Sequence, residues 1–481
     1  MPEETIADFL SRIEGELEAL QGRLKRSLDF AEVERTLTTL VNQVLTALLE
    51  GVLRPVLSDA GWLERLRRLG GRRGMRFKEY RRVRVRLSTG MEVEVVSPYF
   101  IKAAPKRGRR KRGPNGRGSH LGLEALGFIG RCSARLVSEV VQNAVLCPSL
   151  EVAREVLARR GIELDVKTLR RLCGQLGERG LAWRGPASLS GSEQLAGHTL
   201  VIGMDGGRLR ERRCKRGRKK AGQKRQGYHT DWREPKLFTI YLLGPEGEVV
   251  KAFAPLQDAT LGDHEQLFAL LERYLRALDL SHVARLVFCG DGAPWIWNGV
   301  QGLCQRLELD PERVHEVLDY THAVQNLHEI LDLVPAQHRA GQTLDKCWKA
   351  LLWQSDIEGL RQAITETLKG KKKTQALHKW QRYFAHHAQR MRYQQFRDQH
   401  LPCGSGHVES AIRRVINLRL KAPGTFWTRP MAECVLFLRA QLLSGRWDIL
   451  LANLTGKTAH MMADQEAVEH FESVNTLPMA A

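Results

Sequence analysis

The stretch between His198 and His322 constrains the fold most, because strand-like and helix-like segments alternate along it in a fixed order. Short apolar runs bounded by turn residues predict strands at 199–205, 236–243, 248–255, 284–290 and 314–318. Helical spacing of apolar residues predicts helices at 264–278, from Trp295 onward and after the last strand. The chain therefore passes through an antiparallel meander of three strands, then helix, strand, helix, strand and helix. This order predicts an α/β domain with a mixed sheet.

The same order is that of the RNase H-like fold, a mixed sheet with helices on both faces. Two of the predicted strands end in an acidic residue followed by glycine, at Asp205 and Asp291. Carboxylates at neighbouring strand ends supply the oxygen ligands that a pair of Mg²⁺ ions requires, and glycine lets a substrate approach the backbone. A single Asp-Gly pair is also typical of a turn. The recurrence of this pair after two apolar strands is what predicts a metal site.

Glu409 is the candidate for a third carboxylate. It lies in the first turn of a helix predicted to begin after Cys403, whose apolar stripe consists of Val408, Ala411, Ile412, Val415 and Ile416. Burial of this stripe would leave Glu409 at the margin of the helix, facing a cleft. The alternative is that Glu409 only complements the helix dipole, an effect worth less than about 1 kcal/mol.

The net charge of the chain favours nucleic acid as its partner. Lys and Arg number 75 against 54 Asp and Glu, which leaves a formal charge of +21; an anionic membrane surface is the second candidate. Residues 102–118 include eight Lys or Arg, and their Pro and Gly predict a flexible linker that contacts DNA phosphates, or else only a solvated linker. The candidate DNA contacts in this linker are Lys106, Arg107, Arg109, Arg110, Lys111 and Arg112.

A second basic run, at 208–225, follows the first acid directly and holds eleven Lys or Arg against the single acid Glu211. Charge repulsion predicts that this run is disordered without DNA and cradles a cleaved strand, and the alternative is again a solvated loop. Its candidate DNA contacts are Arg208, Arg212, Arg213, Lys215, Arg216, Arg218, Lys219 and Lys220. Arg413 and Arg414, on the predicted helix of Glu409, are two more.

The segment 149–177 predicts two short helices around a turn. Ser149 is the expected cap of the first helix, Gly161 ends it, and Asp165 caps the second. In a helix-turn-helix the second helix contacts a groove or the backbone phosphates, which makes Lys167, Arg170 and Arg171 candidate DNA contacts, together with Thr168. A helical hairpin without DNA contact fits the same pattern, because DNA contact requires an exposed second helix.

The N-terminal region predicts helices followed by a β-hairpin. Apolar residues spaced four and three apart between Ile6 and Leu48 predict a helical hairpin over the first 55 residues, either an intramolecular pair or a dimerisation element. Strict alternation on both sides of Ser88-Thr89-Gly90 predicts a β-hairpin at 82–96 with one basic and one acidic strand.

Cysteine usage and hydropathy predict a cytoplasmic protein. The nine cysteines include no C-x-x-C pair, which argues against zinc fingers and a disulfide framework and favours a reducing compartment. No signal-peptide pattern is visible, and no apolar run approaches the roughly 18 residues of a membrane span. We therefore expect a cytosolic protein without membrane contact.

Taken together, these blocks resemble the DDE transposases of bacterial insertion sequences, specifically the ISKra-like group, over residues 120 to 455. The resemblance rests on three motifs that contain the acids: Val-Ile-Gly-Met-Asp205-Gly-Gly-Arg, Gly-Asp291-Gly-Ala-Pro-Trp-Ile-Trp and Gly-Ser-Gly-His-Val-Glu409-Ser. Further blocks are Trp232-Arg-Glu-Pro-Lys236 and Asn417-Leu-Arg-Leu-Lys421 followed by Phe426-Trp427. Asp319-Tyr-Thr-His322 resembles the Cys/Asp-x-x-His motif that such enzymes place after the fifth strand.

The spacing of the acids resembles the Mutator-like arrangement, in which a domain is inserted before the third acid. Asp205 and Asp291 lie 86 positions apart, and Asp291 and Glu409 lie 118 apart. Apolar residues at helical intervals predict an all-helical insertion at 325–400, with a basic break at Lys369–Lys373.

The resemblance implies a two-metal phosphoryl transferase. Asp205 would bridge two Mg²⁺ ions, for which Mn²⁺ can substitute, while Asp291 and Glu409 would each hold one. His322 would contact a phosphate or the base beside the cut, or would instead be a structural histidine at a helix start. The implied activity is cleavage and strand transfer at the inverted repeats of an insertion sequence, in the bacterial cytoplasm. Double-stranded DNA would be bound by a homodimer or a higher oligomer.

Two other classes of function fit the sequence. One is a DNA-binding regulator that retains the fold without the chemistry, although the presence of all three acids argues against it. The other is an RNase H-like nuclease or resolvase that cuts without joining. The expected domains are an N-terminal helical region (1–75), the hairpin and linker (76–118), the helix-turn-helix region (119–195), the two parts of the α/β core (196–324 and 401–455), the helical insertion (325–400) and a tail (456–481).

Overall fold

The computed structural model describes residues 6–27, 29–102, 118–184, 195–217, 222, 226–335 and 343–460. The chain forms two compact units, one built from the residues up to Leu176 together with a segment from Leu451 onward, and the other from Gly177 to Leu450. Nine predicted DNA contacts lie outside the described residues: Lys106, Arg107, Arg109, Arg110, Lys111, Arg112, Arg218, Lys219 and Lys220.

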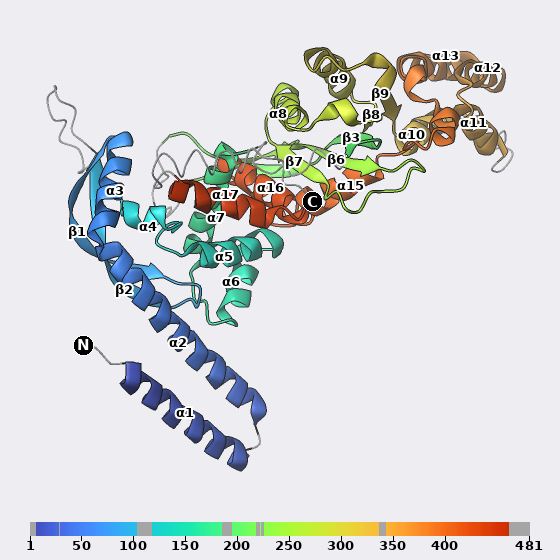
Figure 1. Cartoon of the computed structure of the whole chain (residues 1–481). Helices are drawn as coiled ribbons and strands as arrows, with labels where there is room; N and C mark the ends of the chain where they lie inside the picture. Colours follow the sequence, from blue (N-terminus) through green and yellow to red (C-terminus); the bar gives the residue numbers. More distant parts are fainter. Residues whose placement is uncertain are drawn as a thin grey trace. The chain divides into compact units, whose positions relative to one another are not determined.

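The first unit begins with the predicted helical hairpin, α1 (Ile6–Ser27) and α2 (Phe30–Ser58), followed by α3 (Ala60–Arg72) (Figure 1). Asp29 and Asp59 cap α2 and α3, because each carboxylate accepts a backbone N–H from the first turn. The predicted β-hairpin is confirmed and is longer than expected: β1 (Met75–Arg86) pairs antiparallel with β2 (Glu92–Lys102). Arg84 lies opposite Glu94 and Arg86 opposite Glu92, so opposite charges face each other across the ladder.

Helix α2 corrects one expectation from the sequence. By length and composition it is apolar enough to span a membrane, with a mean hydropathy of 1.3 over its most apolar window, although the core helix of a soluble protein can pass the same test. The prediction that no segment reaches this level was therefore wrong. Its polar residues Asn42, Gln43 and Glu50 are spread among Leu and Val, so no unbroken apolar run marks the helix in the sequence.

The rest of the first unit is helical. It contains α4 (Leu121–Ala125), α5 (Ala134–Leu146), α6 (Leu150–Ala158) and the start of α7 (Val166–Ala182), and the C-terminal helix α17 (Trp447–His460) extends into it. The predicted caps are confirmed: Ser149 accepts from Val152 N at 3.1 Å and Asp165 accepts from Thr168 N at 2.6 Å. Gly161 adopts a φ of +78° just after α6, a conformation that favours glycine.

The second unit is built on a five-stranded mixed sheet in the order β7-β6-β3-β8-β9. β3 (Thr199–Gly206), β6 (Lys236–Leu243) and β7 (Leu256–Thr260) form the predicted antiparallel meander, while β8 (Arg285–Gly290) and β9 (Val314–Leu318) continue the sheet parallel to β3. The third strand was wrongly predicted at 248–255. Polar residues obscured the true strand in the sequence, because buried Asp258 lies inside it, paired with Arg184 at 2.7 Å.

A two-stranded ribbon, β4 (Leu209–Cys214) and β5 (Tyr228–Arg233), is inserted between β3 and β6. It corrects, for residues 208–217, the prediction that the basic run is disordered without DNA; residues 218–221 and 223–225 of the run lie outside the described residues. Cross-strand interactions offset the repulsion, since Glu211 accepts from Arg233 at 2.6 Å and Arg213 pairs with Asp231.

Helices complete the second unit (Figure 1). α8 (His264–Arg276), α9 (Pro294–Arg306) and α10 (Tyr320–Leu331) connect the strands, and the predicted helical insertion contains α11 (Thr343–Trp353), α12 (Ile357–Thr367), α13 (Gly370–Lys379), a π-helical segment (Trp380–Ala385) and α14 (Tyr393–Asp398). α15 (Gly406–Ala411) continues into a π-helical segment (Ile412–Asn417), and α16 (Arg429–Leu443) follows. The lysines predicted to break the insertion instead cap and begin α13, from Lys369 onward.

The two faces of the sheet are covered by different helices. Phe238 packs edge-on against Tyr274 of α8, with ring centroids 5.2 Å apart, whereas Tyr241 stacks on His407 of α15 at 4.0 Å. Side chains alternate between faces along a strand, so α8 and α15 cover opposite faces. A Cβ on Gly203 would lie 3.1 Å from Val408 of α15, which shows how closely this helix crosses β3.

Candidate active site

The first two predicted acids lie at the same end of two adjacent parallel strands. Asp205 is the second-last residue of β3 and lies on the same face as Gly203, the face that α15 covers. Asp291 follows β8 directly. The strands are in register there, with Met204 opposite Gly290. Asp205 accepts a hydrogen bond from Gly206 N at 2.6 Å and Asp291 accepts one from Ala293 N at 2.9 Å.

Asp205 is affected by the charges of the other two predicted acids. The pKa of Asp205 is raised to about 6, chiefly by burial and also by the carboxylates of Asp291 and Glu409, while a hydrogen bond from Gly206 and the charge of His322 oppose the rise. A carboxyl group disfavoured as an anion by burial and by like charges is typical of a site that a cation would neutralise.

A second group of side chains adjoins these acids. Asp319, His322 and Glu409 each offer one ligand atom within 4.8 Å of the others, and within the described residues this is the group whose geometry could hold a metal ion. Glu409 occupies the predicted first turn of α15 and is exposed, whereas its neighbours Val408 and Ala411 are buried as predicted.

Asp319 uses both of its carboxylate oxygens to accept hydrogen bonds within the site. It is 1% exposed, and one of its oxygens accepts from both the backbone N–H of His322, at 2.7 Å, and Nδ1 of that ring, at 3.0 Å. Its other oxygen accepts from Ser405 N, which precedes α15. Burial alone would raise the pKa of Asp319, but the hydrogen bonds from His322 and Ser405 lower it to about 2. Asp319 therefore links the start of α10 to the start of α15.

His322 is oriented by this contact. Its hydrogen bond to Asp319 raises its pKa, burial opposes this, and the charges of Asp319, Asp291 and Asp205 raise it again. With Nδ1 engaged by the carboxylate, the other ring nitrogen is left for a ligand.

The donor set suits a hard divalent cation. Asp205, Asp291 and Glu409 offer carboxylate oxygens, the ligands that Mg²⁺ and Mn²⁺ prefer. Their oxygens do not form a single group within 4.8 Å in the way that Asp319, His322 and Glu409 do. A pair of ions about 4 Å apart is held by carboxylates spread around both ions, so a wider separation of these acids is compatible with two metals.

A hydrogen-bond network from the helical insertion supports the Asp291 loop. The backbone oxygen of Asp291 accepts from Trp297 Nε1 at 2.8 Å, and the ring of His387 bonds to the backbone of Gly292. Arg390 donates to His387 Nδ1 at 3.1 Å and pairs with Glu316 of β9. Burial, then the charges of Arg390 and His386, lower the pKa of His387 to about 4. His387 is therefore neutral and able to both accept and donate.

Sequence reasoning missed this support. A Cβ on Gly292 would fall 2.6 Å from a ring carbon of Tyr383, so the insertion itself requires glycine there. Asp319 was noticed only as part of a motif with His322. Asp319 lies directly after β9, and an acid at the end of a strand is the same signal that pointed to Asp205 and Asp291. This signal could have identified Asp319 as a site residue.

The remaining predicted DNA contacts are exposed or half-buried. In the second unit these are Arg208, Arg212, Arg213, Lys215, Arg216, Arg413 and Arg414, and in the first unit Lys167, Arg170 and Arg171. The helix-turn-helix prediction required an exposed face on α7. These three residues supply it, while Leu169 and Leu172 bury the opposite face.

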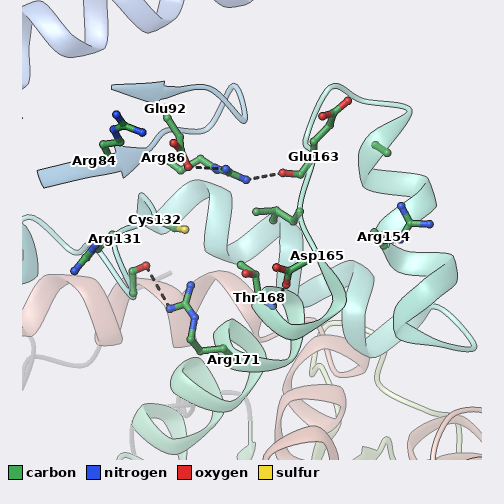
Figure 2. Close-up of a pocket in the computed structure, with 13 residues that line it drawn as sticks. Arg84, Arg86, Glu92, Arg131, Cys132, Arg154, Glu163, Asp165, Thr168 and Arg171 are labelled. Carbon is green, nitrogen blue, oxygen red and sulfur yellow. Dashed lines mark hydrogen bonds and ion pairs between the residues drawn. The ribbon is translucent and has the colours of Figure 1, made fainter. Parts of the chain in front are cut away.

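The start of α7 borders a cavity of about 800 Å³ in the first unit (Figure 2). Its charged lining consists of arginines from the β-hairpin, from the turn before α5, and from α6 and α7, and of three acids: Arg84, Arg86, Arg131, Arg154, Arg171, Glu92, Glu163 and Asp165. Arg86 bridges Glu92, at 2.6 Å, and the backbone oxygen of Glu163 (Figure 2). Arg171 donates only to neutral acceptors, the Gly130 backbone and Gln175. Arg131 has a φ of +66°, unusual for a residue other than glycine, and within the described residues its guanidinium makes no hydrogen bond or ion pair.

Comparison with known proteins adds little to this geometry. No protein-family model matches the chain, and no curated protein matches it. Among solved structures, the Drosophila P element transposase strand transfer complex is similar at 12% identity, over 73% of this chain and 88% of that chain, with a TM-score of 0.25. A similarity at this level carries no argument about fold or function.

Proposed function

We propose that the protein is a DNA transposase of an insertion sequence, which cleaves and joins DNA strands through Asp205, Asp291 and Glu409. The observation that supports the proposal is that Asp205 and Asp291 lie at the same end of two adjacent strands, while Glu409 offers a ligand atom within 4.8 Å of His322. The strand order β7-β6-β3-β8-β9, with three antiparallel and two parallel strands, agrees with an RNase H-like core.

In this proposal Asp205, Asp291 and Glu409 would hold the Mg²⁺ ions through their carboxylate oxygens. Bound divalent ions would polarise the scissile phosphate and lower the pKa of an attacking water or 3′ hydroxyl. His322, held by Asp319, donates from its free ring nitrogen to a phosphate oxygen. The network of Trp297 and His387 keeps the Asp291 carboxylate in place as the charge on the phosphate changes.

DNA binding is assigned to basic surfaces in both units. In the first unit, Lys167, Arg170 and Arg171 of α7 would contact the ends of the element, with the arginines of the neighbouring cavity on the same duplex. A transposase must hold two ends at once, so we expect a dimer or a higher oligomer on DNA. None of the nine cysteines, all of which lie in the described part of the chain, is in a disulfide bond, as suits a protein acting in the bacterial cytoplasm.

The test uses the full chain with labelled duplexes that carry the inverted repeats flanking its own coding sequence. We expect strand cleavage and joined products in Mg²⁺ or Mn²⁺ and binding without cleavage in Ca²⁺. Asp205→Asn and Glu409→Gln should retain end binding and lose cleavage. Glu246→Gln is the matched control, because Glu246 is 82% exposed on the turn after β6.

Other results would favour the other functions. Normal cleavage by either site variant would remove that acid from the proposed centre. Specific end binding without cleavage in any divalent ion would indicate a regulator, and cleavage without joined products would indicate a nuclease or resolvase.

A further inference from the structure

The β4–β5 ribbon leaves the sheet directly after Asp205 and carries exposed aromatic rings on one face. Arg210 lies opposite Trp232 and Cys214 opposite Tyr228 in the register of the ribbon, so these residues share that face. Trp232 is 58% exposed and Tyr228 is 41% exposed.

A third ring joins this face from a distant part of the chain. The backbone around Trp427 runs along the free edge of β4, since Trp427 N donates to the Arg210 oxygen at 3.0 Å and Arg212 N donates to the Trp427 oxygen at 2.6 Å. This pairing places Phe426, 37% exposed, 5.9 Å from Tyr228 between ring centroids. We call Trp232, Tyr228 and Phe426 the ribbon aromatics.

Arginines lie over these rings. The guanidinium of Arg210 is 4.6 Å from the centroid of Phe426 and 5.6 Å from that of Trp232, and Arg212 is 4.1 Å from Tyr228. Cation–π attraction of this kind holds the planar groups in a layer of alternating rings and guanidinium ions.

At the base of the ribbon, the opposite face is buried in the second unit, whereas Arg213 farther along it is exposed. Leu209 is fully buried, and Glu211, 6% exposed, is paired with Arg233. Trp427 is 7% exposed and donates from Nε1 to the backbone oxygen of Leu420 at 3.1 Å. The base of the ribbon is therefore anchored through its buried face, and the face that carries the ribbon aromatics is exposed to solvent.

Most of the exposed aromatic side chains of the described residues lie on this face of the ribbon. Five aromatic side chains are largely exposed in the part of the chain that the structure describes, and three of them are the ribbon aromatics; the others are Phe30 and Tyr80. Clustered exposed apolar side chains indicate a binding surface, whereas isolated ones are ordinary.

The rings and arginines of the ribbon indicate which class of ligand could bind them. Cations already occupy the rings, so a cationic ligand would be repelled, and a ligand that is both flat and anionic would stack on the rings and pair with the arginines. Nucleotides have these properties, and their base faces become accessible only when the strand is unpaired. We propose that the ribbon aromatics bind unpaired nucleotides of a single DNA strand by stacking.

This inference rests on the proposed function, to which it adds the place of the separated strand. The base of the ribbon is tied to the acid-bearing end of β3, because Gly207 N donates to the Pro235 oxygen at 2.8 Å and a Cβ on Gly206 would fall 2.3 Å from Glu234 Oε1. Nucleotides stacked on the ribbon would thus adjoin Asp205.

The test measures equilibrium binding of the full chain to labelled oligothymidylate and to a blunt duplex, in EDTA so that no cleavage occurs. Trp232→Ala and Tyr228→Ala should each weaken oligothymidylate binding about tenfold, in line with the loss of one stacked base, and leave duplex binding nearly unchanged. Trp232→Phe should restore most of the affinity, since a ring remains to stack.

Two comparisons separate stacking from charge. Tyr80→Ala is the matched control, because Tyr80 is 41% exposed like Tyr228 but lies on β1, and it should bind as the native protein does. Arg210→Gln should lower the salt dependence of binding by about one unit of slope, whereas Trp232→Ala should not.

The proposal is overturned if native protein fails to bind oligothymidylate, if both alanine variants bind it normally, or if they lose duplex binding equally. A change in solution mass of Trp232→Ala without DNA would overturn it in favour of a surface between copies. This binding test is independent of the proposed chemistry, because Asp205→Asn should still bind oligothymidylate. If the ribbon aromatics prove not to bind single strands, metal-dependent cleavage is still tested by its own assay.

Discussion

At the scale of single residues, the ionised form of Asp205 is unfavourable in the folded protein. Asp205 is buried beside Asp291 and Glu409, which is why its pKa is raised to about 6 from an ordinary value of 3.8. A raised carboxyl pKa destabilises the folded protein as pH rises through the interval between the two values, and the penalty is complete above the folded value. At this residue the proposed metal binding and the stability of the metal-free fold are therefore opposed.

Asp205→Asn should stabilise the metal-free protein above pH 6 and have no effect below about pH 4. A shift of this size corresponds to at most about 3 kcal/mol. Thermal unfolding in EDTA across this pH range measures the effect. Added Mg²⁺ should raise the melting temperature of the native protein above pH 6 and leave that of the variant unchanged. An equal gain from the substitution at pH 4 and pH 8 would contradict the electrostatic cause.

His387 provides a second prediction at this scale, because it holds the Gly292 backbone without touching the proposed metals. His387→Phe removes the donor and should raise the Mg²⁺ concentration for half-maximal cleavage by about tenfold or more, as loss of an outer-shell partner does. DNA binding in Ca²⁺ should be unaffected. His387→Gln, which can still accept from Arg390 and donate, should recover part of the metal affinity; equal defects in both variants would indicate a packing role instead.

At the scale of elements, α2 has one partnered and one open side. Leu53 and Leu57 are buried in the first unit, in a cluster with the β-hairpin. Val41, Leu45, Leu48 and Val52 are 60%, 40%, 63% and 69% exposed, and their spacing of four, three and four residues is that of a coiled-coil seam. This open stripe is the strongest support within the described residues for self-association through the N-terminal helices.

Replacing Leu45 and Leu48 together by Glu should convert a native dimer to a monomer, because charges would then occupy the seam. Light scattering at several concentrations measures the change. Thr39→Glu, an exposed position on the opposite side of the same helix from the stripe, is the control. A native protein that is monomeric but co-sediments with lipid vesicles would assign the stripe to a membrane instead, in keeping with the hydropathy of α2.

At the scale of the whole molecule, the chain has a formal excess of 21 positive charges, and exposed basic side chains occur in the described residues of both units. Arg131 and Arg171 in the first unit have no acidic partner within the described residues, and both line the cavity beside α7. Each phosphate that such residues neutralise contributes about 0.9 to the slope of log affinity against log salt.

Arg131→Gln combined with Arg171→Gln should therefore reduce this slope by about two for duplex binding. Fluorescence anisotropy over a series of NaCl concentrations provides the measurement. Arg361→Gln is the control, since Arg361 is already paired with Glu358 on α12. A parallel shift of the salt plot, with no change in slope, would place these arginines away from the phosphates.

Much of the secondary structure was predictable from local sequence. Caps such as Ser149 and Asp165 were predictable because a side-chain oxygen satisfies backbone donors only a few residues away, and the apolar strands around Asp205 and Asp291 were predictable because burial leaves few residue types. Where polar residues are paired across the fold, as for Asp258 in β7 and Glu211 in β4, the local pattern led to a wrong boundary or to predicted disorder.

The candidate site shows the same division. Asp205, Asp291, His322 and Glu409 could be chosen from motifs, since each follows a strand or begins a helix. Their mutual arrangement, the linking role of Asp319 and the support of the Asp291 loop by His387 depend on contacts between residues far apart in the chain. Such contacts leave no periodic trace in the sequence, because hydrogen bonds and charges act through space, and only the packing of α10, α15 and the insertion around the sheet brings them into range.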